Sequence, residues 1–92
     1  MKIDLQDFAE KLYGIKRDEH ICFHDLETEN SYIAECFYRN DVLYLLVTMY
    51  GVMVEVYNLN DYYDKDVLLN DIQYDFGISD EVEITDNNED DA

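Results

Sequence analysis

The stretch VLYLLVTMYGVMVEVY, residues 42–57, decides the fold that this sequence predicts. It is nearly continuous in Val, Leu, Met and Tyr, which favours β structure, but its sixteen residues are too many for one ordinary strand. Gly51, next to Tyr50, is its only breaker, and glycine readily adopts the backbone conformation of a tight turn. We therefore expect two antiparallel strands that turn there. One bulged strand is the alternative, because Tyr-Gly is a weaker turn signal than Asn-Gly.

Two further strands are expected before this stretch. Residues 32–39 alternate in character with a period of two, which predicts a strand with two different faces that ends at Asn40 and Asp41. Residues 20–24 have a β-favouring centre and predict a short strand, and the polar residues 25–30 after it predict a turn.

Helical spacing appears on both sides of these strands. Residues 4–13 repeat apolar side chains at helical intervals, carry acids in the first turn and are followed by Gly14 at the position of a C-terminal cap. Residues 64–76 predict a second helix that ends at Gly77. Its apolar face consists of Leu68, Leu69, Ile72 and Phe76.

The fold class that follows is α+β. We expect an antiparallel sheet of about four strands, with an N-terminal and a C-terminal helix packed on one face. Residues 81–84 predict at most a small edge strand. Residues 1–85 should form a single acidic domain, and residues 86–92 a disordered acidic tail, because the tail has no large apolar residue to anchor it.

Charge is the outstanding feature of the composition. The chain has 23 Asp and Glu against 6 Lys and Arg, a formal net charge of −17. Such a surface repels nucleic acid and anionic membranes and attracts a basic groove, so we expect a basic protein partner and no direct binding of nucleic acid or membrane. No apolar run is long enough to span a bilayer and the N-terminus does not resemble a signal peptide, so we expect a cytoplasmic protein.

Most of this charge lies in the last third, where residues 61–92 hold 12 acids and a single base, Lys65. Asp64, Asp71 and Asp75 fall on one flank of the second predicted helix, and carboxylates at such spacing lie about 6 Å apart, close to the separation of phosphates along a strand. The row is a candidate partner-binding site, although acids can also serve only to solvate a surface. The other candidate residues are Asp61, Tyr62, Tyr63, Asp66, Tyr74, Asp80, Glu81 and Glu83.

Tyrosine is the second unusual feature, with nine in the chain and no tryptophan. Tyr32 and Tyr38 share one face of their predicted strand, and Tyr44 and Tyr50 share one face of the next. A sheet that two helices cover on one side would leave an aromatic face open to a partner or to a second copy, so a homodimer is a possible state.

The sequence offers little chemistry. Cys22 and Cys36 are expected to stay unpaired in a reducing compartment. His20, Cys22 and His24 share one side of a strand and would need a further ligand such as Cys36 to hold a metal; this spacing matches no recognised zinc motif, and the question stays open. With three glycines and no phosphate loop or nucleophile–base pair, we expect no enzyme and no cofactor.

Small size, acidity concentrated at one end, tyrosines beside the acids and no catalytic motif together resemble a class of proteins, the nucleic-acid-mimic inhibitors of phages and mobile elements, which include anti-CRISPR and anti-restriction proteins. The resemblance covers about a third of the chain and is one of class, since no family motif matches residue by residue. It implies a DNA-mimic inhibitor that occupies the basic nucleic-acid groove of a bacterial defence nuclease, such as a CRISPR effector, and blocks its substrate. Two alternatives are an immunity protein that neutralises a nuclease toxin and an acidic adaptor that mimics nothing.

Overall fold

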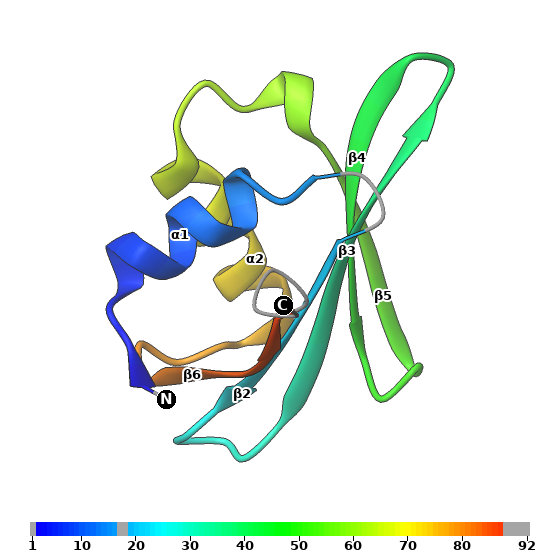
Figure 1. The fold of residues 1–92 in the computed structure, drawn as a ribbon. Coiled ribbons are helices and arrows are strands. Elements are labelled where there is room, and N and C mark those ends of the chain that lie inside the picture. Colours follow the sequence, from blue (N-terminus) through cyan, green and yellow to red (C-terminus); the bar gives the residue numbers. More distant parts are fainter. Residues whose placement is uncertain (1, 17–18, 88–92) are drawn as a thin grey trace.

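The computed structural model describes residues 2–16 and 19–87 (Figure 1). Its elements, in chain order, are β1 (Lys2–Ile3), α1 (Leu5–Tyr13), β2 (His20–Asp25), β3 (Ser31–Arg39), β4 (Val42–Met49), β5 (Met53–Asn58), the 3-10 turn η1 (Leu59–Asp61), α2 (Lys65–Phe76) and β6 (Val82–Asn87). The expected α+β class, with an antiparallel sheet and two helices, is confirmed.

The sheet has six strands rather than about four, in the order β1-β6-β2-β3-β4-β5, and all neighbours are antiparallel. The two additional strands are β1, which was not expected, and β6, which is not a small edge strand over residues 81–84 but an inner strand between β1 and β2. It continues through Asn87, which pairs with Ile21, so two residues of the expected tail belong to the sheet. Residues 88–92 of that tail lie outside the described residues.

Both hairpin turns around β4 use a left-handed backbone. Asn40 and Asp41 have φ of 52° and 64°, and Tyr50 and Gly51 have φ of 54° and 70°. Two successive residues with positive φ are typical of the tight turns whose twist matches that of the strands they join. The Val52 N–H donates to the Met49 carbonyl at 3.0 Å and closes the second turn. The expected hairpin at Gly51 is confirmed, and the alternative of one bulged strand is wrong.

The helix ends follow from side-chain capping. The Asp4 carboxylate accepts from the Gln6 N–H at 2.7 Å, and the Asp64 carboxylate accepts from the Asp66 N–H at 2.9 Å. Each aspartate satisfies an N–H that has no partner inside its helix. Gly77 ends α2 with φ of 69°, a conformation that costs glycine little.

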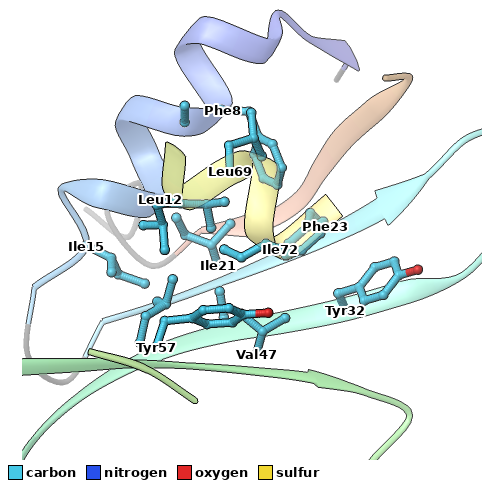
Figure 2. Close-up of a cluster of buried hydrophobic side chains, with 14 of the residues drawn as sticks. Phe8, Leu12, Ile15, Ile21, Phe23, Tyr32, Val47, Tyr57, Leu69 and Ile72 are labelled. Atoms are coloured by element: carbon cyan, nitrogen blue, oxygen red, sulfur yellow. The ribbon is translucent and has the colours of Figure 1, made fainter. Parts of the chain in front are cut away.

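One core lies between the helices and one face of the sheet, as Figures 1 and 2 show. The buried side chains of α1 and α2 meet buried residues of β2, β3 and β4 there. Phe23 is in the middle, with its ring centroid 4.8 Å from that of Phe8 and 5.0 Å from that of Tyr32. Among the described residues, no helix lies over the opposite face of the sheet (Figure 1).

A buried carboxylate ties two distant loops together. Asp25 is fully buried at the end of β2 and accepts hydrogen bonds from the N–H and hydroxyl of Ser79 and from the Glu27 N–H. Burial alone favours the neutral acid, but these donors outweigh it and lower the pKa of Asp25 to about 2. The ionised Asp25 therefore fixes the β2–β3 turn to the segment between α2 and β6.

Candidate partner-binding surface

The flank of α2 that carries the predicted carboxylate row faces β5 and η1. Asp71 and Asp75 are four residues apart and lie on one flank of α2, beside its buried stripe. Asp64, which was expected within the helix, is instead its N-cap, so it stands at the start of this flank and its carboxylate also caps the helix. The Tyr57 hydroxyl donates to Asp75 Oδ2 at 2.9 Å, and the Tyr62 hydroxyl donates to Asp71 Oδ2 at 2.7 Å. These two bonds orient the carboxylates on a surface-exposed helix.

The two tyrosines stay protonated and therefore remain donors at neutral pH. Burial, and then the hydrogen bond to Asp71, raises the pKa of Tyr62 to about 12. Burial and the bond to Asp75 likewise raise the pKa of Tyr57. The ring centroids of Tyr57 and Tyr62 are 6.5 Å apart, with the rings edge to face. We call this pair, whose hydroxyls donate to Asp75 and Asp71, the tyrosine support.

Two further acids contribute to the negative field at this support. Glu55 raises the pKa of Tyr57 and Asp61 raises that of Tyr62 through their charges. The acidic flank, as we use the term below, consists of Glu55, Asp61, Asp64, Asp71 and Asp75. Lys65, the only base among residues 61–92, is directed to the other helix, where its Nζ lies 2.9 Å from Glu10 Oε1.

Exposed apolar side chains accompany the acidic flank. Tyr63 is 98% exposed, Tyr74 is 89% exposed and Val67 is 50% exposed. Val67 and Tyr74 are seven residues apart and so lie on one stripe of α2, next to the flank. None of the three belongs to the core, which leaves their apolar area available for a partner.

The structure separates the other predicted acids from the row. Asp66 and Gln73 lie on the opposite flank of α2, and the Gln73 side-chain amide donates to Asp80 Oδ1 at 3.1 Å. Glu81 forms an ion pair with Lys2, and Glu83 is the register partner of Lys2 in β1. Asp80, Glu81 and Glu83 therefore do not extend the row.

Sequence reasoning missed Glu55 and Tyr57. They share the side of β5 that faces the helices, and only the pairing of β5 with β4 and the position of α2 bring the Tyr57 hydroxyl to Asp75. The alternation of residues along β5 would place them on one face, but it would not say which helix lies opposite.

The residues considered above as metal ligands do not converge. His20, Cys22 and His24 are on the outer side of β2, whereas Cys36 is buried on the helix side of β3, where its thiol donates to the Ile15 carbonyl at 3.3 Å. Burial raises the pKa of the Cys36 thiol to about 11. In residues 2–16 and 19–87, no three His, Cys, Asp or Glu side chains are arranged to hold a metal ion.

Neither described helix has the length and apolarity needed to cross a membrane. Comparisons with protein-family models, curated proteins and solved structures gave no match to this chain.

Proposed function

We propose that the protein inhibits a bacterial defence nuclease by inserting its acidic flank into the groove that binds nucleic acid. The observation that carries the proposal is the row of Asp64, Asp71 and Asp75, two of them held by tyrosine hydroxyls, beside the exposed Tyr63 and Tyr74. No chemistry is required, because occupying the groove excludes the substrate.

The row supplies negative charge in a form that a phosphate-binding groove can use. A carboxylate has about four acceptor positions, so Asp71 and Asp75 keep acceptor capacity after each binds one hydroxyl. Arginine and lysine side chains that normally contact phosphates bind carboxylates by the same charge-assisted hydrogen bonds.

Preorganisation should strengthen this binding. Tyr57 is buried and Tyr62 is half-buried, so their hydroxyls hold Asp75 and Asp71 in place before a partner arrives. Side chains that are already ordered lose less conformational entropy on binding.

Tyr63 and Tyr74 would add contact area that does not depend on charge. A tyrosine ring has few rotatable bonds and stacks on arginine, which makes exposed tyrosines effective at interfaces with basic proteins. Charge attraction would then speed association, and the rings would slow dissociation.

A two-stage binding experiment tests the proposal. Immobilised wild-type protein is exposed to a bacterial lysate, and each retained protein is then challenged with added nucleic acid. The expected partner is a basic nuclease that is released by nucleic acid and by high salt, and whose activity falls when the protein is added. Retention of a partner that is not basic, or that nucleic acid does not displace, would contradict the proposal and favour an adaptor.

A further inference from the structure

The face of the sheet opposite the helices carries a regular block of apolar side chains. Side chains alternate along each strand, and the buried Ala34, Leu45 and Tyr57 point toward the helices, so their sequence neighbours point away. The cross-strand pairs of β3, β4 and β5 then set these neighbours in three rows. The rows are Ile33, Thr48 and Val54; Glu35, Leu46 and Val56; and Phe37, Tyr44 and Asn58.

We call these nine positions the open face. Six of the nine are apolar, and Leu46 is at the centre with Val56 as its cross-strand neighbour. Val54 and Val56 are about half exposed, at 53% and 50%. The rings of Phe37 and Tyr44 stack, with their centroids 5.4 Å apart and an angle of 17° between their planes. One corner of the face is therefore aromatic.

Charge distinguishes the open face from the rest of the molecule. Acids make up 23 of the 92 residues, but Glu35 is the only charged residue of the nine, and its cross-strand neighbour on β2 is His20. A basic partner would find little to attract it here. The occupant that fits a flat, nearly uncharged apolar surface is another surface of the same kind.

We infer that the open face is a self-association surface on which a second copy of this chain packs, sheet against sheet. Two such faces can pack about 10 Å apart around a two-fold axis near Leu46. In this arrangement α2 and its acidic flank lie on the far side of each sheet, away from the second copy (Figure 1). The acidic flank of each copy is then separated from the second copy by its own sheet.

The size of the face sets the strength of the dimer. Nine positions with strands about 4.8 Å apart and alternate residues about 6.8 Å apart cover roughly 300 Å² of flat area. Stable interfaces bury about 800 Å² on each partner, so this face supports only a weak, transient dimer. The high negative charge of both copies also opposes the dimer, and added salt should therefore strengthen it.

Sedimentation equilibrium of the full chain, at concentrations up to about 1 mM, tests the inference. We expect a monomer–dimer equilibrium that tightens when NaCl is raised from about 50 mM to about 500 mM. The proposed binding of a basic nuclease should weaken over the same range of NaCl concentration. Because salt has opposite effects on the two interactions, the dimer and the proposed function can be refuted separately. A chain that is monomeric throughout, or a dimer that dissociates as salt rises, would overturn the inference.

A matched pair of substitutions assigns the dimer to this face. Val56 on the open face and Val67 on α2 are both 50% exposed, and threonine replaces either with almost the same shape. Val56→Thr should raise the dimer dissociation constant about tenfold and Val67→Thr should leave it unchanged. Val54→Thr repeats the test if Val56→Thr alters the circular dichroism spectrum. Equal effects of the open-face and α2 substitutions would contradict the assignment.

Discussion

Asp25 and the pair Asp71 and Asp75 are the same kind of side chain in opposite situations. Asp25 is fully buried, and its oxygens accept from the Glu27 N–H and from both donors of Ser79. Asp71 and Asp75 are exposed, and one oxygen of each accepts a single tyrosine hydroxyl. Asp25 holds two loops together, while Asp71 and Asp75 are oriented but still available. In a chain with 23 acids, the number of hydrogen-bond donors around a carboxylate therefore separates an aspartate that stabilises the fold from aspartates that remain available to a partner.

Replacing Asp25 should have the largest effect on stability. Asp25→Ala leaves the N–H groups of Glu27 and Ser79 without their acceptor inside the protein, which should lower the free energy of unfolding by about 3 kcal/mol. Urea unfolding measures the change, and Glu27→Ala, in the exposed part of the same turn, is the control. If Asp25→Ala lowers the free energy of unfolding no more than Glu27→Ala does, Asp25 does not stabilise the fold, and its contrast with Asp71 and Asp75 is wrong.

The contribution of Asp25 should also depend on pH. Because its folded-state pKa is about 2 and the pKa of an unfolded aspartate is about 3.9, ionised Asp25 stabilises the fold above about pH 4. That contribution, about 2 to 3 kcal/mol, should be lost progressively as pH falls from about 5 to about 1. The difference in unfolding free energy between wild type and Asp25→Asn isolates this effect, since protonation of the many surface acids occurs in both. A difference that stays constant over that range would contradict the lowered pKa.

Tyr57 should have a moderate effect. Tyr57→Phe removes the hydroxyl that donates to Asp75, and we expect a loss of about 1 kcal/mol in unfolding free energy, because water can replace the hydroxyl at an exposed carboxylate. Thermal and urea unfolding measure it, with the exposed Tyr74→Phe as a control that should change nothing. If Tyr57→Phe matches Tyr74→Phe, the tyrosine does not hold the row in place.

Tyr32 should have the smallest effect, and of the opposite sign. Its hydroxyl is buried and has no hydrogen-bond partner among the described residues. Tyr32→Phe removes a polar group that the core leaves unsatisfied, so the free energy of unfolding should stay unchanged or rise by up to about 1 kcal/mol. A loss as large as that of Tyr57→Phe would mean that the Tyr32 hydroxyl also has a stabilising partner.

Local patterns predicted both helices and the strands β2 to β5, but not all of their neighbours. The Tyr50–Gly51 turn and the stripe of α2 depend on residues close in sequence, and both were predicted. The position of β6 depends on pairing with β2, about 60 residues away, and no local pattern encodes it. For the same reason the sequence grouped Asp80 with the row on α2 and missed Tyr57, which tertiary structure brings to Asp75.

The most direct test of the proposed function compares two triple substitutions that remove equal charge. One neutralises the row, with Asp64→Asn, Asp71→Asn and Asp75→Asn, in which asparagine can still cap the helix and accept from the tyrosines. The other neutralises the acids that the structure places elsewhere, with Asp66→Asn, Asp80→Asn and Glu81→Gln.

The measurement is the affinity of each variant for the captured nuclease at one salt concentration. We predict that the first variant binds about 30-fold more weakly than wild type and the second less than about threefold more weakly. Equal losses would mean that net charge alone drives binding and that the row on α2 has no special role.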